Sequence, residues 1–220
     1  MTRFGVVRFP GSCDDIDALL ATRRFGEGEL LWHRDRDLKG VDAVVIPGGF
    51  SYGDYLRVGA IARFSPVMEA VAEFAAGGGP VLGICNGFQV LCEARLLPGA
   101  LLPNTSLRFI ARQVDIVVEN AATPFTRACE GGERLSIPVK HTTGRYYHPE
   151  PASLGDQVVF RYAAGQNPNG SIDDIAGVSN EARNVVGLMP HPEHAVDLLT
   201  GSADGGMLFA SLVSAPAVPA

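Results

Sequence analysis

The sequence predicts an α/β fold: an open, mostly parallel, twisted sheet with helices on both faces and a small antiparallel extension. In the first half of the chain, short apolar runs alternate with helical patterns, which is typical of strand–helix–strand units. Short glycine and proline joints separate these elements and favour right-handed crossovers between parallel strands. After Leu96, β-rich runs follow one another without long helices, which indicates the antiparallel extension. The 220 residues are expected to form a single domain over residues 1–213, with a frayed Pro/Ala-rich tail over 214–220.

The first half supplies the elements of the parallel sheet. A first helix begins at Asp14 or Asp15, because aspartate caps helix N-termini. Ser65 and Pro66 start another helix in the same way, and Gly77 ends it. The predicted strands are 4–9, 30–32, 43–46 and 81–84, and the predicted helices are 14–24, 66–76 and 88–93. The runs 43–46 and 81–84 are continuously apolar, so these strands are expected to be buried on both faces.

The second half is expected to add strands and a closing helix. The run 106–118 alternates and places Leu107, Phe109 and Ala111 on one face of a strand. Further strands are predicted at 135–139, 158–162 and 185–189, and a last helix at 207–213.

The composition excludes several classes of protein. The chain has 18 basic and 24 acidic residues and a net charge of −6, which disfavours a nucleic-acid partner. The N-terminus lacks the apolar core of a signal peptide, and no run reaches the roughly 18 apolar residues of a membrane span. The four cysteines form no CxxC pair. We therefore expect a cytoplasmic protein with reduced thiols and no membrane partner.

A cysteine in a tight turn is the first candidate for chemistry. Residues 83–87 read G-x-C-x-G, follow a buried strand and lead into a helix, as in a nucleophile elbow. The glycines avoid collisions in the turn, so Cys85 projects at the carboxyl end of the sheet. The partial positive charge of the helix N-terminus favours its thiolate, and the N–H of Asn86 is available to an oxyanion. The alternative is a buried structural cysteine.

The base for this thiol is predicted after the strand 185–189. Pro192 favours extended backbone at His191, which lets Glu193 point the same way and fix the tautomer of the histidine. A zinc site at His191 and His194 competes with this interpretation. Pro192 forbids the helix that would align the two histidines, and no third ligand is evident, so no metal is expected.

A glycine pair follows another buried strand. The backbone N–H groups near Gly48 and Gly49 are available to complete an oxyanion hole opposite Asn86, although such a pair is often a simple turn. The chain has neither a G-x-x-x-x-G-K-[ST] nor a G-x-G-x-x-G fingerprint, so no nucleotide cofactor is expected on it.

These motifs resemble the class I (triad) glutamine amidotransferases. The pattern G-x-C-x-G-x-Q runs from Gly83 to Gln89, and His191-Pro192-Glu193 matches the His-x-Glu of that family. The stretches 8–12, 47–57, 167–171 and 187–193 extend the resemblance, more narrowly to the glutaminase subunits of phosphoribosylformylglycinamidine synthase. By position, the resemblance implies Cys85 as nucleophile, His191 as general acid/base and Glu193 as its orienter. It also implies contacts to glutamine or its oxyanion from Gly48, Gly49, Phe50, Asn86 and Gln89.

The resemblance also implies partners. Ammonia from L-glutamine would pass to a separate ATP-dependent synthetase subunit, which carries ATP and magnesium and makes formylglycinamidine ribonucleotide, and a small subunit would bridge the complex. Side chains expected to face a partner or solvent are Arg108, Arg112, Lys140, Arg145, Tyr146 and Tyr147. The chain departs from the family at His194, where arginine is common, and near Thr142-Thr143, where an acidic residue is common.

Two other functions stay open on the sequence. One is a stand-alone cysteine hydrolase on a similar elbow. The other is a thiol chaperone or redox protein of the DJ-1 type, in which a histidine directly follows the elbow cysteine, whereas Asn86 stands here. A non-catalytic binding module would not need His191 and Glu193.

Overall fold

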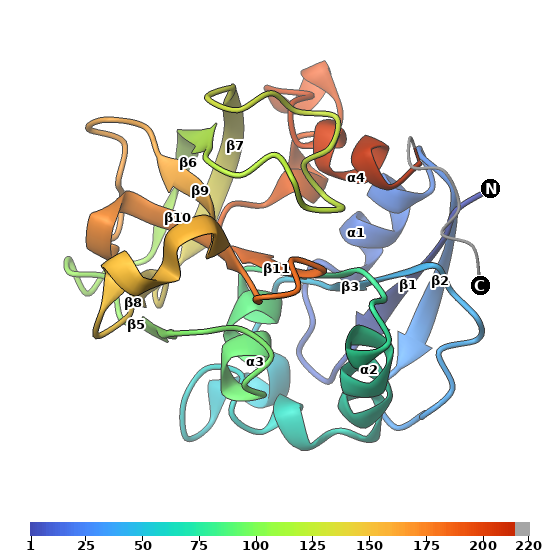
Figure 1. The fold of residues 1–220 in the computed structure, drawn as a ribbon. Coiled ribbons are helices and arrows are strands. Elements are labelled where there is room, and N and C mark those ends of the chain that lie inside the picture. Colours follow the sequence, from blue (N-terminus) through green and yellow to red (C-terminus); the bar gives the residue numbers. More distant parts are fainter. Residues whose placement is uncertain (214–220) are drawn as a thin grey trace.

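The computed structural model describes residues 1–213, so the predicted tail over 214–220 lies outside the described residues. Within residues 1–213, nine strands form one mixed sheet in the order β2-β1-β3-β4-β11-β10-β9-β6-β7 (Figure 1). The parallel half consists of β2 (Glu27–Trp32), β1 (Arg3–Arg8), β3 (Ala43–Ile46), β4 (Val81–Ile84) and β11 (Val185–Leu188). The antiparallel half consists of β10 (Ile175–Ser179), β9 (Val158–Tyr162), β6 (Ile110–Val118) and β7 (Arg134–His141). A separate ribbon pairs β5 (Ala100–Leu102) with β8 (Arg145–Tyr147).

Helices cover both faces of the parallel half, which confirms the predicted fold class. In Figure 1, α1 (Asp15–Thr22) and α4 (Gly206–Val213) lie on one side of the sheet, and α2 (Pro66–Ala76) and α3 (Asn86–Glu93) lie on the other. Every residue of β3, β4 and β11 is buried, as expected for strands covered on both faces. None of the helices within residues 1–213 is long and apolar enough to cross a membrane.

This topology brings four loops to one edge of the sheet. Because β1, β3, β4 and β11 run parallel, the segments that follow them leave at the same edge. These segments carry Asp14, Gly48, Cys85 and His191. The edge strand β7 reaches the same place, because the backbone N–H of His191 donates to the carbonyl of Pro138 at 2.8 Å.

Some local predictions were wrong. The strand predicted from residue 106 begins at Ile110, and Leu107 and Phe109 are exposed because residues 104–107 form a hydrogen-bonded turn with φ +54° at Leu107. The buried strand β10 was not predicted, since its alanine and glycine are weak β-formers. Its Gly177 is required there, because a Cβ would lie 2.6 Å from the carbonyl oxygen of Gly187.

The two predicted helix caps also differ in detail. Asp14 and Ser65 stand at the N-cap positions of α1 and α2, but neither side chain accepts a capping hydrogen bond. The hydroxyl of Ser65 pairs with that of Tyr52 at 2.9 Å instead. The Asp14 carboxylate points into the cluster described next.

Candidate active site

Cys85 lies at the sharp turn between β4 and α3, as predicted. Its backbone has φ 50° and ψ −102°, outside the regions that a non-glycine residue ordinarily adopts. Such a conformation costs about 1–3 kcal/mol and persists only where the surrounding structure enforces it. Strain at this residue therefore supports a role other than packing.

The flanking glycines make the turn possible. A Cβ at Gly87 would collide with the carbonyl oxygen of Ile46 on β3, and one at Gly83 would lie 2.8 Å from the backbone of Gly87. The first turn of α3 therefore lies directly against the strands, as the spacing of the motif predicts.

His191 and Glu193 form the predicted pair. Their side chains are buried, and the Glu193 carboxylate accepts a hydrogen bond from Nδ1 of His191 at 2.6 Å. The route differs from the expected one: with φ −105° and ψ 87° the backbone at His191 is not fully extended, and Pro192–His194 form a 3₁₀ turn that carries Glu193. The glutamate fixes the proton on Nδ1 and leaves Nε2 free for the reaction.

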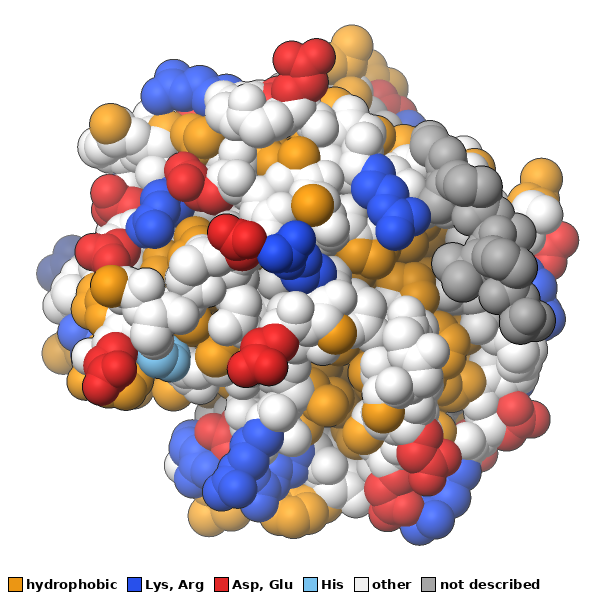
Figure 2. Space-filling model, viewed as in Figure 1, with side chains coloured by type: hydrophobic (Ala, Val, Ile, Leu, Met, Phe, Trp, Pro, Cys, Tyr) orange, Lys and Arg blue, Asp and Glu red, His pale blue; other side chains and the backbone are white. Residues whose placement is uncertain are grey.

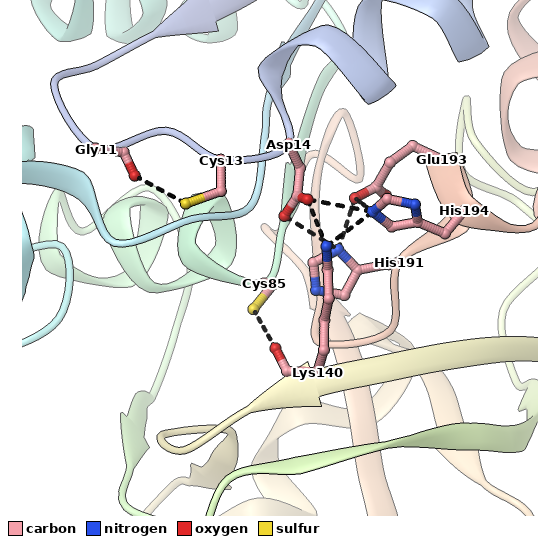
Figure 3. A network of polar contacts seen from close by, with 8 residues as sticks. All are labelled: Gly11, Cys13, Asp14, Cys85, Lys140, His191, Glu193 and His194. Atoms are coloured by element: carbon pink, nitrogen blue, oxygen red, sulfur yellow. Dashed lines mark hydrogen bonds and ion pairs between the residues drawn. The ribbon is translucent and has the colours of Figure 1, made fainter.

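The buried charges favour a protonated His191. Burial by itself lowers the pKa of the imidazole, but the negative charges of Glu193 and Cys85 outweigh it and raise that pKa to about 10. Figure 3 shows the imidazole beside the Cys85 sulfur. Within residues 1–213, Nε2 of His191 has no hydrogen-bond partner, whereas Sγ of Cys85 lies 3.8 Å from the carbonyl oxygen of Lys140. His191 is therefore placed to hold a proton beside the Cys85 sulfur and to exchange it during a reaction at that sulfur.

The predicted substrate contacts lie around this pair in different ways. Gly49, Phe50 and Gln89 line the cavity beside Cys85. The Asn86 side chain accepts from the backbone N–H of Ser51 at 3.1 Å and donates to Gln89 at 2.7 Å, which leaves the predicted oxyanion contact of this residue to its backbone N–H.

Gln89 is already engaged with the opposite wall of the cavity. Its amide donates to the carbonyl of Thr143 at 2.6 Å. His141, Thr142 and Thr143 line this wall of the cavity. Burial together with the charge of His191 lowers the pKa of His141 to about 4, so this imidazole is neutral at pH 7.

Gly48 packs against the side chains of His191 and Asp14. Its carbonyl accepts from the backbone N–H groups of Cys13 and Asp14, each at 3.2 Å, which fixes the glycine turn against the preceding loop. A Cβ on Gly48 would collide with the Asp14 carboxylate and lie 2.6 Å from Cε1 of His191.

Gly48→Ala is therefore expected to displace His191 and to lower glutaminase activity by about 10²-fold, since misplacing a catalytic group by about 1 Å costs that much. Gly131→Ala is the matched control, because its new Cβ meets nothing within 4 Å. Steady-state ammonia release by the two variants makes the comparison, and equal activity would contradict this role of Gly48.

A cluster of charged residues beside the triad was missed on the sequence. Asp14 was predicted only as a helix cap, Lys140 as a partner-facing residue and His194 as a weak zinc ligand. Here the Lys140 ammonium donates to Asp14 at 2.5 Å and lies 2.9 Å from Nε2 of His194 (Figure 3). The two partners Asp14 and Lys140 are 126 residues apart, so no spacing signal links them.

The same cluster bears on the zinc alternative. The statement that no third ligand is evident was wrong, because ligand atoms of Asp14, His191, Glu193 and His194 lie within 4.8 Å of one another. The Lys140 ammonium, however, contacts both Asp14 and His194 and supplies a positive charge among these groups.

Comparison with known proteins agrees with this geometry. A family model described as a CobB/CobQ-like glutamine amidotransferase domain matches residues 2–206. The chain belongs to this family. A phosphoribosylformylglycinamidine synthase subunit PurQ from Rubrobacter xylanophilus is 60% identical over 220 residues, covering 97% of this chain and 99% of the relative. The subunit of the same name from Frankia casuarinae is 58% identical, covering 96% and 93%.

A solved structure is similar as well. A chain in the structure of PurLQS from Thermotoga maritima superposes with a TM-score of 0.90 at 46% identity, covering 96% of this chain and 97% of that one. The resemblance to glutaminase subunits predicted from the sequence is thereby confirmed.

Proposed function

We propose that this chain is the glutaminase subunit of a phosphoribosylformylglycinamidine synthase. It hydrolyses L-glutamine to glutamate and ammonia and delivers the ammonia to an ATP-dependent synthetase subunit, which converts formylglycinamide ribonucleotide to formylglycinamidine ribonucleotide in de novo purine biosynthesis. The observation that carries the chemistry is the strained Cys85 turn beside the buried His191–Glu193 pair. The near full-length relatives named PurQ support the pathway.

The chemistry follows from the protonation states. The Cys85 thiolate attacks the side-chain carbonyl of glutamine, and the resulting oxyanion accepts hydrogen bonds from the backbone N–H groups at Asn86 and Gly49. His191 then gives its proton to the leaving nitrogen, so that ammonia departs and a γ-glutamyl thioester remains. Water, deprotonated by His191, attacks the thioester, releasing glutamate and the Cys85 thiolate. Glu193 stabilises the imidazolium at each stage in which His191 holds both protons.

The synthetase subunit is proposed to cover the mouth of the cavity. Phe50 and Phe109 line the cavity and remain about half exposed, and other large apolar side chains nearby in sequence are also exposed: Tyr55, Leu56, Phe64 and Leu107. Figure 2 shows basic side chains together with apolar ones at the lower left, where Figure 1 places the segment around residues 50–64. A partner seated there would keep ammonia from water.

The partner-facing residues predicted from the sequence were partly wrong. Tyr146 is buried, stacks on Phe88 and donates its hydroxyl to the carbonyl of Pro98 at 3.0 Å. Lys140 is engaged with Asp14. The proposed surface therefore consists of the apolar segments around the cavity.

The cofactors and the compartment follow the same proposal. ATP and magnesium are assigned to the synthetase subunit, and a small subunit bridges the complex. We place the activity in the cytoplasm. All four cysteines of the sequence are free and lie within the described residues, and a reducing compartment keeps thiols in that state.

The isolated chain is expected to hydrolyse glutamine slowly. The rate should rise about 10²–10³-fold when the synthetase subunit, the bridging subunit and their ligands are added, because that is the effect of one correctly placed oxyanion donor. The test is ammonia release by the purified chain before and after this addition, together with ATP-dependent formation of the amidine. Full turnover without partners would favour a stand-alone hydrolase. No ammonia under either condition would favour a thiol chaperone or redox protein.

A further inference from the structure

Asp14 is a buried carboxylate that the proposed reaction does not use. It comes from the loop between β1 and α1, and its side chain is 5% exposed. One oxygen lies 3.7 Å from Nδ1 of His191, the nitrogen that also bonds Glu193. The other oxygen contacts Lys140 at 2.5 Å and Nε2 of His194 at 3.2 Å.

Lys140 links the surroundings of Cys85 to those of His191. Its backbone carbonyl lies 3.8 Å from Sγ of Cys85, while its ammonium donates to Asp14 and lies 2.9 Å from Nε2 of His194 (Figure 3). It stands near the end of β7, directly before His141 and Thr142 of the cavity wall. The Lys140–Asp14 bond therefore ties the antiparallel half of the sheet to the first loop of the parallel half, across the reactive groups.

The surrounding charges keep Asp14 ionised beside the histidine. Burial would raise the pKa of Asp14, but the hydrogen bond from His194 and the positive charges of His191 and Lys140 hold it well below its usual range. Asp14 is thus an anion held 3.7 Å from His191 rather than at bonding distance. The titratable and charged groups facing His191 are Cys85 at the start of α3, Glu193 and His194 on its own loop, Asp14 after β1, and Lys140 and His141 on β7.

We propose that Asp14 and Lys140 form a positioning pair for the triad. The Asp14 charge stabilises the His191 imidazolium, and the Lys140 charge partly offsets this stabilisation. The charged groups of Asp14 and Lys140 are not proposed to contact the reacting atoms of the substrate. Its role in glutamine hydrolysis rests on the function proposed above, whereas its electrostatic effect on Cys85 and His191 does not.

The proposal predicts opposite pH shifts for variants of Asp14 and Lys140. Asp14→Asn removes an anion and leaves Lys140 uncompensated, so both protons of the thiol–imidazole pair are lost at lower pH. Lys140→Met removes a cation and leaves Asp14 uncompensated, so both are lost at higher pH. The expected shifts are on the order of 1 pH unit in each direction, and the double variant is expected to return close to the wild-type values.

The test is the rate of Cys85 alkylation by iodoacetamide against pH in the full-length isolated chain, which needs no glutamine turnover. Asp15→Asn and Arg134→Met are the matched controls, because Asp15 pairs with Arg8 and Arg134 stands at the far end of β7. Both controls are expected to keep the wild-type profile. In the assembled complex, Asp14→Asn is also expected to lower kcat by about 10²-fold, the cost of misplacing a catalytic group, with little change in KM.

Shifts in the same direction for both charge variants, or an unchanged profile in either, would overturn the proposal. A purely structural role would not make the direction of the pH shift depend on the charge that is removed. If Asp14→Asn does not fold, the upward shift of Lys140→Met alone decides the question. Opposite shifts in a chain that releases no ammonia would refute the glutaminase function and leave the pair intact.

Discussion

Replacing Cys85 with alanine is expected to lower glutamine hydrolysis by about 10⁶-fold, the effect of removing a nucleophile from a catalytic triad. We expect no other thiol to replace it, because burial raises the pKa of Cys92 and Cys129, and partial burial with the charge of Asp14 raises that of the exposed Cys13. The fold should survive, since only one sulfur atom is removed from the turn. Ammonia release and thermal unfolding of the two proteins measure the two effects.

A glycine variant separates chemistry from strain at the same position. Because Cys85 has φ +50°, Cys85→Gly should relieve strain that Cys85→Ala retains. We expect the glycine variant to have a free energy of unfolding about 1 kcal/mol higher than that of the alanine variant, with both inactive. Urea titration measures the difference, and a less stable glycine variant would show that the turn is not strained.

An electrophilic analogue of glutamine is expected to label Cys85 and to spare the other three thiols. Peptide mapping of the labelled chain gives the answer. Equal labelling of Cys92 would contradict the assignment of the nucleophile, because burial raises the pKa of that thiol strongly and it lies outside the cavity.

His191→Asn should cost more activity than Glu193→Gln. The first change removes the group that carries the proton, and about 10⁶-fold is expected. The second leaves the imidazole but removes the charge that holds its pKa near 10, and about 10⁴-fold is expected. The measurement is kcat/KM for ammonia release in the assembled complex.

The two changes are expected to be far from additive. Once His191 is absent, Glu193 has no imidazole to orient, so the double variant should be about as active as His191→Asn alone. Wild-type turnover in His191→Asn would refute its role as the general acid/base.

Glu193→Gln also has a predicted effect on pH dependence. The charge of Glu193 raises the pKa of His191, so losing that charge should release the imidazolium proton at lower pH. The upper inflection in the pH profile of Cys85 alkylation should therefore move toward neutral pH. An unmoved inflection would mean that Glu193 only orients the ring.

The sequence by itself determined the elements whose signals are local. Continuous apolar runs identified β3 and β4, and the glycines around Cys85 identified the turn, because the steric limits of a turn act over neighbouring residues. His191 and Glu193 were predicted for the same reason, being two residues apart, although a 3₁₀ turn rather than extended chain joins them.

Only the tertiary structure decided what stands around these residues. The Asp14–Lys140 bond joins segments 126 residues apart, and the burial of Tyr146 depends on the packing of the β5–β8 ribbon against Phe88 of α3. Periodicity predicts on which face of its own strand a side chain lies, but its contacts with distant segments are set by how the two halves of the open sheet pack. A charge such as that of Lys140 therefore looks like an ordinary surface residue in the sequence, and becomes part of the site because strand β7 ends beside Cys85.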